Sequence, residues 1–397
     1  MTEIGTPTED DRDQVANVLR VSLNLGHGFI EHRAAKLPLE RFRCAFDGKR
    51  VLGVAAERRF RQRFGGRELQ TSGIWGVGTL PEHRGTGLAT RAVGRLLHEA
   101  RDRGAALSAL YPATLRPYRG LGYELAGTYT EHRVALDDLP RGGGPLAVEE
   151  YEASRDLEGV RDCYRRATES QNGPIDCDED GWWPERVMGH PIPEELHRAV
   201  VARTARGAVE GYASFVHEKD DGDLDVSFRL ACRHLVASTL DGVASLLGYF
   251  RGFRGLGRTL QFTGPPADPL AMLVEEQRLR PSWTFRWMLR VLDARAALEG
   301  RGYQPVSGEA VVAVEDGMFP ENRGPWRVVA DRGAVEVSIA EGARVRPVPI
   351  GTFSAMYSGF LSPFDAARLG IMDADDPAVP LLARLLAGPA PFMLDFF

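Results

Sequence analysis

The chain has 397 residues, of which 43% are hydrophobic, and its formal net charge at pH 7 is −6. This length predicts two or three domains, and the acidic balance argues against nucleic acid as a partner while remaining compatible with a cationic substrate. No apolar run reaches the roughly 18 residues of a membrane helix, and the acidic N-terminal stretch is unlike a secretory signal or a transit peptide. We therefore expect a cytoplasmic protein with no membrane partner.

The first 140 residues predict a helix followed by an antiparallel meander. Strands are expected near 42–46, 50–63 and 67–79, because Asp47-Gly48 and Gly65-Gly66 can form the tight turns between them. The third strand must end at Leu80-Pro81, since a proline nitrogen has no hydrogen to give to the ladder. A Gly/Pro-rich stretch at 139–145 is expected to be a linker.

A glycine-rich loop, "EHRGTG", follows this strand and leads into a helix that is expected to begin near Leu88. The helix has an apolar stripe and an opposite charged face; the stripe comprises Leu88, Ala92, Val93, Leu96, Leu97 and Ala100. Gly85 and Gly87 let the N–H groups of the loop converge at a helix N-terminus, where the dipole favours an anion. Arg84 adds a cation, so this arrangement suits a pyrophosphate, although a simple glycine turn is the alternative interpretation.

The next segment repeats the meander–helix plan. Three strands are predicted in "RAVVART", "GAVEGYASFVHEK" and "GDLDVSFRLAC", then a helix in "STLDGVASLLGYFRGF" and a strand in "TLQFTG". Its strand-to-helix junction, "CRHLVASTLDG", has no Arg-x-x-Gly-x-Ala, which predicts a structural role for the second copy. From about Trp287 the pattern changes to short strands and helices, which predicts a third, α+β segment.

Four cysteines, Cys44, Cys163, Cys177 and Cys232, are scattered and form no CxxC, which favours reduced core thiols over disulfides or zinc. "DCDEDG" at 176–181 begins like a calcium loop, but the twelfth position is Val187 where a bidentate glutamate is needed. We interpret this stretch as a solvated acidic turn. His27 and His32 are five residues apart and do not share a helix face. No metal site is therefore predicted.

The stretch from Val77 to Tyr123, with Arg84-Gly-Thr-Gly87-Leu-Ala89 after a β-meander, resembles the acetyl-CoA-binding motif of the GNAT acyltransferases. With "ALYPATLRPYRGLGYE", two GNAT-like halves, an α+β tail and a terminal phenylalanine, the chain resembles the Eis (enhanced intracellular survival) family of N-acetyltransferases. The resemblance implies an α/β (α+β) protein: tandem GNAT folds with mixed, mostly antiparallel sheets, and a C-terminal sterol-carrier-protein-like domain. The expected domains are 1–143, 144–285 and 286–397.

The resemblance also implies roles for individual residues. Backbone groups at the end of the splayed strand would grip pantetheine, with the Val77 amide as the donor to the thioester oxygen, and the glycine loop would hold the pyrophosphate. The expected acetyl-CoA-binding residues are Val77, Gly78, Thr79, Arg84, Gly85, Thr86, Gly87, Leu88, Ala89 and Ala113. An ordinary strand remains the alternative for Val77 and Thr79. Candidate contacts of the acceptor are His27, Phe29, Glu31, Trp75 and Trp287, although Trp283, Phe285 and Trp287 fit a domain-boundary core equally well.

The resemblance implies a general acid and a general base. Tyr118 falls where the family has its acid, and a phenol near pKa 10 can protonate a thiolate whose parent thiol is near 8.5. Tyr123 fits a core position better, and Tyr111 is a weaker candidate for the acid. The family uses the α-carboxylate of a terminal phenylalanine as base, and this chain ends at Phe397. If the tail docks into a cleft, we expect burial of Phe392, Met393, Leu394 and Phe396; a tail pinned only for stability is the alternative.

The resemblance implies an acetyl-CoA-dependent N-acetyltransferase that acetylates primary amines of polyamine acceptors, aminoglycoside-like or lysine-bearing. The resemblance implies a homo-oligomer, a hexamer. A GNAT enzyme of narrow specificity for one metabolite or protein amine is an alternative. Another is a non-catalytic sensor of acetyl-CoA or lipid, although the presence of Tyr118 and Phe397 argues against it.

Overall fold

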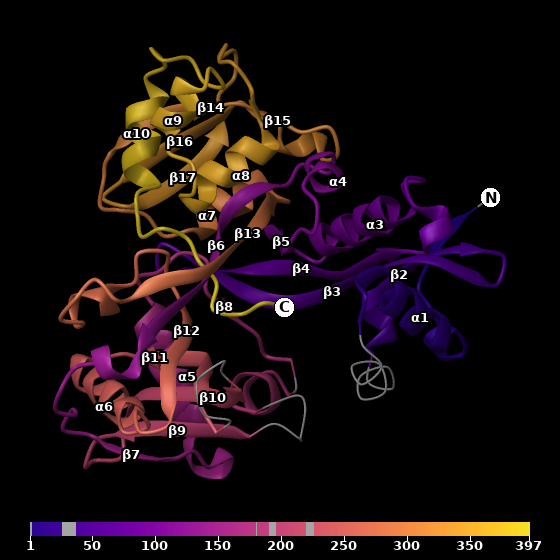
Figure 1. Cartoon of the computed structure of the whole chain (residues 1–397). Helices are drawn as coiled ribbons and strands as arrows, with labels where there is room; N and C mark the ends of the chain where they lie inside the picture. The colour runs from indigo at the N-terminus through magenta and orange to yellow at the C-terminus, as the bar shows by residue number, and fades with distance from the viewer. Residues whose placement is uncertain (1, 26–36, 180, 190–195, 220–225) are drawn as a thin grey trace.

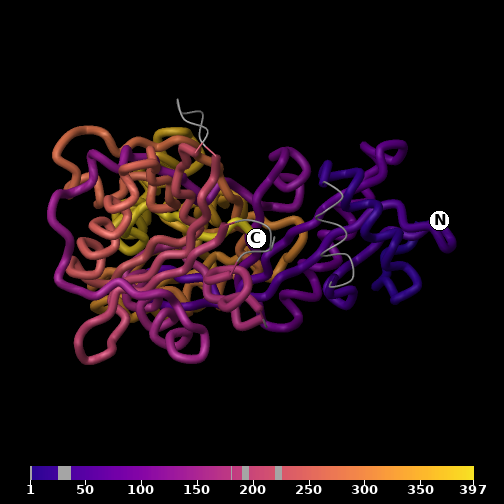
Figure 2. Tube along the Cα trace, turned by 60° about the horizontal axis from the view of Figure 1, so that its bottom comes forward, coloured from indigo at the N-terminus to yellow at the C-terminus, as the bar shows by residue number. Residues whose placement is uncertain are grey.

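The computed structural model describes residues 2–25, 37–179, 181–189, 196–219 and 226–397. Three lobes meet at the centre of the molecule, where the long strands β3 (Arg50–Phe64) and β4 (Arg67–Thr79) reach β6 (Glu124–Ala135) and β13 (Arg280–Val291) (Figure 1). The N-terminus lies at the far end of the first lobe, whereas the C-terminus lies in the middle of the molecule (Figure 2).

The first lobe contains the predicted meander and the helix that follows the glycine loop. Its other elements are β1 (Glu3–Gly5), α1 (Arg12–Leu23), β2 (Phe42–Asp47), α3 (Leu88–Asp102), β5 (Leu107–Leu110) and α4 (Arg116–Arg119), with single 3-10 turns η1 (Glu9–Asp11), η3 (Leu39–Arg41), η4 (Pro81–His83) and η5 (Leu136–Asp138). Gly48, Gly65 and Gly66 have φ of +58°, +59° and +83°, the left-handed turn geometry that the Asp-Gly and Gly-Gly pairs predicted. Every residue of the apolar stripe on α3 is buried.

The second lobe repeats this plan, as the sequence predicted. Its elements are β7 (Ala147–Glu150), α5 (Ala153–Thr168), β8 (Ile175–Asp176), the π-helical turn η6 (Trp182–Val187), β9 (His197–Arg203), β10 (Val209–Lys219), β11 (Phe228–Ala237), α6 (Leu240–Arg251), β12 (Gly257–Gly264) and the 3-10 turn η7 (Pro269–Met272).

The third lobe packs small sheets against helices. Its elements are α7 (Ala294–Gly300), β14 (Gly308–Val312), β15 (Val314–Glu315), the 3-10 turn η8 (Pro320–Asn322), β16 (Trp326–Asp331), β17 (Ala334–Ile339), β18 (Val348–Pro349), α8 (Ile350–Ser358), α9 (Pro363–Arg368) and α10 (Ala378–Leu385). Strands β14, β16 and β17 form one sheet, and β15 pairs with β18. Figure 1 shows this lobe, in orange to yellow, above the centre of the molecule.

One continuous sheet joins the first two lobes. Its order is β1-β2-β3-β4-β5-β13-β6-β12-β11-β10-β9-β7, with β8 added to β3. Strand β13, late in the sequence, pairs with β5 through Met288–Val291, while β6 pairs with β12 through 130–135. Each half thus receives its last strand from the other half. Strand β13 begins at Arg280, earlier than the strand that the change of pattern near Trp287 suggested, because it pairs with β6 along most of its length.

The four cysteines are buried and free, which agrees with the predicted core thiols. No helix among the described residues is long and apolar enough to cross a bilayer.

The strand exchange predicts that the first half cannot fold without the rest of the chain. A fragment of residues 1–143 lacks β13, so strand β5, whose Leu107 and Leu110 are buried, would become an exposed apolar edge. We expect this fragment to show no cooperative urea transition by circular dichroism. Co-expression with residues 144–397 should restore the transition. A cooperative transition of the isolated fragment would contradict the prediction.

Candidate functional site

The sheet opens at the end of strand β4. Strands β4 and β5 pair only from Thr71–Leu107 to Ile74–Leu110, after which β5 ends and β4 continues to Thr79 paired with β3 on its other side. Beyond Ile74, no described strand pairs with β4 on its β5 side. A β-bulge lies in this open part, because two residues, Gly76 and Val77, stand opposite the single Ala55 of β3, and Gly76 has a φ of +58°. The backbone groups of Val77 and its neighbours therefore face a gap in the sheet.

The loop after β4 presents an uncapped helix N-terminus. Gly85 and Gly87 have φ of +79° and +77°, and a Cβ added to either would meet nothing within 4 Å. Gly87 is the N-cap of α3 and provides no side chain to the first-turn N–H groups. Both glycines are therefore required by backbone conformation and leave one face of the loop open. This combination is suited to an anion.

Arg84 stands at this loop with its side chain exposed. Its guanidinium forms no ion pair or hydrogen bond with any residue that the structure describes, whereas its backbone N–H donates to Pro81 O at 3.3 Å. Thr86 instead donates its hydroxyl to the carbonyl oxygen of His83 at 2.6 Å and so closes the turn. The loop is held by its own contacts, and the guanidinium of Arg84 remains available to a ligand.

Tyr118 lies on the short helix α4, beside the open part of β4. Its ring packs edge-on to Tyr123, with ring centroids 6.2 Å apart, and against the apolar cluster that includes Ile74 and the stripe of α3. Val77 packs against the same cluster. Burial raises the pKa of Tyr118 to about 12. Its hydroxyl makes no hydrogen bond to another described residue, whereas the hydroxyl of Tyr123 is bound to Ser108 at 2.6 Å in the core, as expected for Tyr123.

The last residues of the chain run into the centre of the sheet. Thr128 on β6 donates its N–H to Pro391 O at 3.1 Å and accepts from Met393 N at 3.0 Å, so the tail pairs with β6 like a short strand. Phe392 N donates to Asn172 O at 2.9 Å. The hydroxyl of Tyr111 donates to Asp395 O at 2.8 Å. The tail is therefore fixed by hydrogen bonds from β6, from the loop after α5 and from the Tyr111 side chain.

Phe397 reaches the first lobe. Its ring packs edge-on to Phe60 of β3 at 4.9 Å between centroids and to Tyr111 at 5.5 Å. It also lies 2.7 Å from where Gly73 of β4 would carry a Cβ. Successive strand residues point to opposite faces, so Phe397 lies on one face of β4 while Ile74 and the cluster with Tyr118 lie on the other.

The burial expected for the tail is confirmed for Phe392, Met393 and Leu394. The expectation was wrong for Phe396, which is 46% exposed. Its ring stacks on Tyr111 at 4.1 Å, so it lies over the surface of that ring rather than inside the core.

The residues that were predicted to contact the acceptor lie in different environments. Trp75 is half-buried; its ring touches Phe42, and Arg58 lies 5.8 Å from its centroid. Trp287 is completely buried and donates its indole N–H to Thr128 O at 3.2 Å, so the core interpretation describes it. Ala113 is exposed in the loop between β5 and α4. His27, Phe29 and Glu31 lie outside the described residues.

The acidic stretch at 176–181 was expected to be a solvated turn. This expectation was wrong for Asp176, which is buried, and is confirmed for Asp178, whose side chain is 53% exposed. Both carboxylates pair with Arg61 of β3. Asp176 also accepts the indole N–H of Trp183 at 3.1 Å. Both carboxylates form ion pairs with arginine, and these pairs connect the second lobe to the first.

Several residues of this centre were not predicted from the sequence. His234 on β11, Asn172, and the glycines at 73, 127 and 173 all contact the tail. A Cβ at Gly127 would lie 2.6 Å from Pro391 O, and one at Gly173 would lie 2.3 Å from Phe392 O. Glycine inside a strand signals close approach of another backbone, and this signal was present at Gly73 and Gly127.

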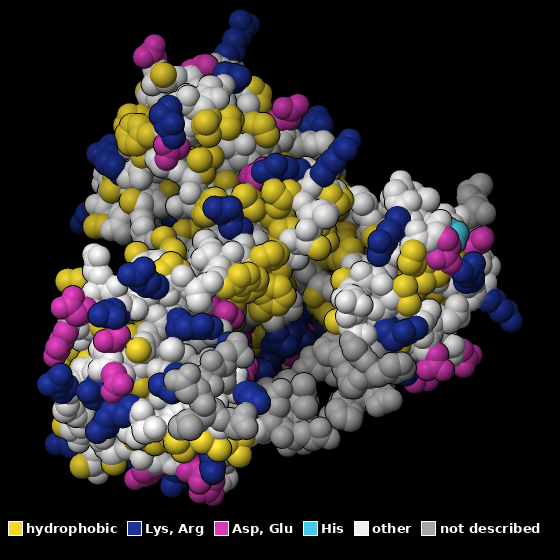
Figure 3. Space-filling model, viewed as in Figure 1, with side chains coloured by type: hydrophobic (Ala, Val, Ile, Leu, Met, Phe, Trp, Pro, Cys, Tyr) yellow, Lys and Arg dark blue, Asp and Glu magenta, His cyan; other side chains and the backbone are white. Residues whose placement is uncertain are grey.

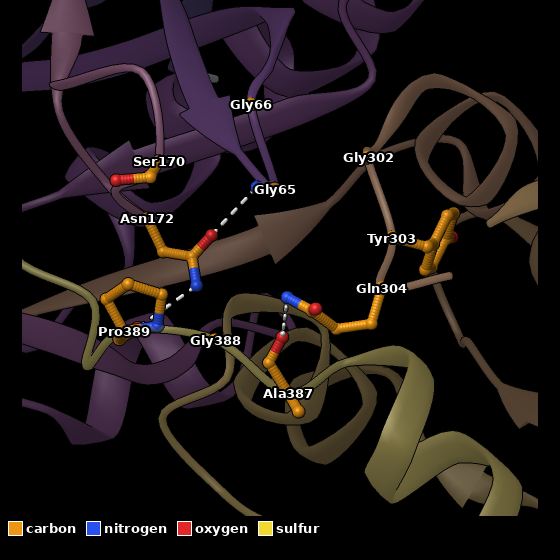
Figure 4. A pocket seen from close by; sticks show the side chains of 10 residues that line it. All are labelled: Gly65, Gly66, Ser170, Asn172, Gly302, Tyr303, Gln304, Ala387, Gly388 and Pro389. Atoms are coloured by element: carbon orange, nitrogen blue, oxygen red, sulfur yellow. Dashed lines mark hydrogen bonds between the residues drawn. The ribbon is translucent and has the colours of Figure 1, made fainter. Parts of the chain in front are cut away.

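A pocket of about 170 Å³ lies at the root of the tail, where the three lobes meet (Figure 4). Asn172 crosses it, accepting from Gly65 N at 2.8 Å and donating to Pro389 O at 3.0 Å. Its lining contains none of the residues predicted for catalysis or cofactor binding. A hollow between the first two lobes is a separate feature, with Lys or Arg side chains at its bottom and a hydrophobic patch on its rim (Figure 3).

Comparison with protein families divides the chain into three. Residues 3–126 and 178–291 each match an acetyltransferase (GNAT) domain, and residues 294–394 match a sterol carrier protein domain. The exact domain limits of 143 and 285 remain a prediction.

Individual relatives agree with this division. An uncharacterized N-acetyltransferase of Streptomyces avermitilis is 27% identical over 367 residues, covering 86% of this chain and 84% of that protein. N-acetyltransferase Eis of Mycobacterium tuberculosis is 28% identical over 294 residues, covering 68% of each chain. The crystal structure of a GCN5-related N-acetyltransferase from Anabaena variabilis superposes with a TM-score of 0.91 at 25% identity and covers 100% of both chains.

The exposed Arg84 gives a test of the anion site. Arg84→Ala should weaken coenzyme A binding by roughly 1–2 kcal/mol, about 5- to 30-fold, because one charge-assisted contact to the pyrophosphate is lost. The free energy of unfolding should change by less than about 0.5 kcal/mol. Isothermal titration and urea unfolding measure the two quantities. Arg95→Ala is the matched control, because Arg95 lies on helix α3, which follows the loop, and pairs with Glu99. Equal affinities of the two variants would remove Arg84 from the site.

Proposed function

Because the chain is a GNAT-type acyltransferase of the Eis-like family, with two GNAT domains and a sterol carrier protein domain, we propose that it acetylates primary amines of polyamine acceptors. Aminoglycoside-like compounds and lysine-bearing peptides are the acceptor classes. The acetyl donor is acetyl-CoA, the co-substrate of GNAT domains. In this proposal Tyr118 is the general acid and the α-carboxylate of Phe397 is the general base, with Phe397 as the last residue of the working enzyme.

The open edge and the glycine loop support the assignment of the co-substrate site. Backbone groups of Val77 and Gly78 on the side that β5 leaves without a strand partner offer hydrogen bonds to the amides of pantetheine, whereas the carbonyl oxygen of Thr79 already accepts from the Ser22 hydroxyl at 3.0 Å. The N-terminus of α3 and Arg84 offer positive charge to the pyrophosphate. Gly78, Gly85, Thr86, Gly87, Leu88, Ala89 and Ala113 complete the proposed set. The amide of Val77, freed by the bulge, would polarise the thioester carbonyl.

Transfer then requires three proton movements. Phe397 would accept the proton that the ammonium group loses to become a neutral amine. The amine nitrogen forms a bond to the carbonyl carbon of the thioester while the carbon–sulfur bond breaks, and Tyr118 would give its hydroxyl proton to the leaving sulfur. The second proton, which the nitrogen loses as the amide forms, would return Tyr118 to its neutral form. The raised pKa of Tyr118 keeps that proton in place, and the same desolvation makes a thiolate more basic, so the two groups stay matched.

The observation that carries this proposal is the position of the two groups about strand β4. Phe397 lies over Gly73 on one face, and Tyr118 packs with Ile74 on the other. A thioester held at the open edge just beyond these residues would have its base on the side of the attacking amine. Its acid would be on the side of the leaving sulfur.

A narrow-specificity transferase is the second candidate, and one observation favours it. Trp283 and Phe396 are 44% and 46% exposed and form, with Phe285, an aromatic surface beside Phe397. Such a surface suits an acceptor with one amine and an aromatic or apolar body. A panel of aminoglycosides, lysine peptides and aromatic amines, followed by coenzyme A release and mass spectrometry, distinguishes the candidates. A sensor would release none.

We also propose a cytoplasmic homo-oligomer, a hexamer as the family resemblance implies. The buried free cysteines fit a reducing compartment. Light scattering coupled to size-exclusion chromatography measures the oligomeric state.

Tyr118→Phe tests the acid. The variant keeps the ring that packs on Tyr123 and loses only the proton donor, so kcat should fall by roughly 10²-fold or more. Affinity for acetyl-CoA should hardly change. Because burial raises the pKa of Tyr118 to about 12, its hydroxyl stays protonated up to pH 10. The wild-type rate should therefore not decline between pH 7 and 10. Tyr123→Phe is the control for a buried tyrosine hydroxyl. Normal turnover of Tyr118→Phe would exclude the assignment.

Extending the chain by two glycines after Phe397 tests the base. The extension displaces the carboxylate, so the rate near neutral pH should fall by roughly 10²–10⁴-fold. The loss should shrink toward pH 10, because the amine then loses its proton to solvent. Removing the extension with a protease that restores Phe397 is the control. Full activity of the extended enzyme, with unchanged melting temperature, would contradict the carboxylate mechanism.

A further inference from the structure

The second half of the sheet contains a gap that matches the gap beside β4. Strand β11 pairs with β12 only from Phe228 to Ala231 and then continues to Ala237 paired only with β10 on its other side, as β4 continues beyond β5. Strand β12 ends at Gly264, opposite Thr130 of β6. Beyond that point, the part of β11 that has no β12 partner and residues 124–129 of β6 border an opening between them.

The C-terminal tail fills this second opening. Pro391 and Met393 make their backbone hydrogen bonds to Thr128, on the stretch of β6 that β12 leaves unpaired. His234, on the stretch of β11 without a β12 partner, contacts Asp395 of the tail, with 3.1 Å between Nε2 and Oδ1. The tail therefore joins the two borders of the gap.

The helix after β11 has no open anion site. Thr239 is the N-cap of α6, and its hydroxyl accepts from Gly242 N at 3.2 Å. In the first half the corresponding N-cap is Gly87, which has no side chain to give. The second half thus lacks both an empty gap and an uncapped helix end.

A buried chain of hydrogen bonds holds the tail in this gap. The Nε2–H of His234 faces the carboxylate of Asp395, and Nδ1 then accepts from the hydroxyl of Tyr212 on β10 at 3.1 Å. His234 and Tyr212 are completely buried, and Asp395 is 5% exposed. Arg186 on η6 donates to Phe396 O from the same half. Groups this buried must be paired, so the chain fixes one tail position.

From these contacts we propose that the second GNAT domain is a receptor for the C-terminal tail. The C-terminal tail binds in the gap between β11 and β6 of this domain. This gap corresponds to the proposed co-substrate gap of the first domain. His234 and Tyr212 act through Asp395 as positioning residues for the carboxylate of Phe397. This role rests on the proposed function of Phe397. Phe397 is two residues beyond Asp395 along the chain, a span of at most about 7 Å, so the position of Asp395 limits where the carboxylate can be.

Digestion of the folded enzyme by a carboxypeptidase tests the receptor without relying on activity. The tail of the wild type should resist release of phenylalanine, whereas His234→Ala and Asp395→Ala should release it at least about tenfold faster. His132→Ala is the matched control, because His132 is also buried and binds Pro265 O rather than the tail. Asp395→Ala changes only the tail, so it remains informative if His234→Ala fails to fold. Release from Asp395→Ala at the wild-type rate would overturn the proposal.

Kinetics test the positioning role. His234→Ala and Asp395→Ala should each lower kcat by roughly 10–100-fold, the effect of a misplaced catalytic group, with the KM for acetyl-CoA unchanged. The kcat of the double variant should be no lower than the kcat of the less active single variant, because both substitutions break the same hydrogen bond. Additive losses, or near-normal kcat in both single variants, would overturn it. An enzyme that stays active when extended beyond Phe397 refutes the carboxylate mechanism instead, and the digestion experiment still reports on the receptor.

Discussion

The structure depends on the unequal length of neighbouring strands in one sheet. Strands β5 and β12 end while β4 and β11 continue, and each early end leaves backbone N–H and C=O groups without a strand partner. Buried backbone groups of this kind must find another partner. In the second half the tail supplies it, through hydrogen bonds to Thr128 of β6. In the first half the corresponding edge is open, and we assign it to the co-substrate.

The exchange of β6 and β13 makes these two gaps parts of one system. Strand β6 of the first half pairs with β12 of the second half, and β13, which follows the second half in the sequence, pairs with β5 of the first. The strand that borders the second gap is therefore part of the same chain segment as the core of the first half. The tail leaves the third lobe after α10, pairs with β6 and reaches β3 and β4 with Phe397. Gly65 and Gly302 touch so closely at this junction that a Cβ on either would lie 2.0 Å or less from the other's carbonyl oxygen. The third lobe therefore determines where the tail begins, and the second lobe determines where it is held.

The proposed acid and the proposed base are held in place by different kinds of contact. Tyr118 lies on a four-residue helix and depends on the apolar cluster shared with Val77 and the stripe of α3. Phe397 depends on aromatic rings from β3 and the β5–α4 loop, and on the missing side chain of Gly73. The resulting arrangement places the two groups on opposite faces of β4. This geometry allows the amine to attack one side of the thioester carbonyl while the thiolate leaves from the other side.

The sequence by itself determined the local structure. Asp47-Gly48, Gly65-Gly66, the proline at 81 and the stripe of α3 specified the strands and the helix beside the glycine loop, because turn conformation and amphipathic periodicity are properties of near neighbours. Motif and resemblance named Arg84, Tyr118 and Phe397. Only the tertiary structure decided that β6 and β13 change places, that Asp176 and Asp178 pair with Arg61, that Phe396 stays exposed, and that His234 receives the tail. These outcomes depend on contacts between residues more than a hundred positions apart, and no local pattern encodes which buried polar group meets which partner.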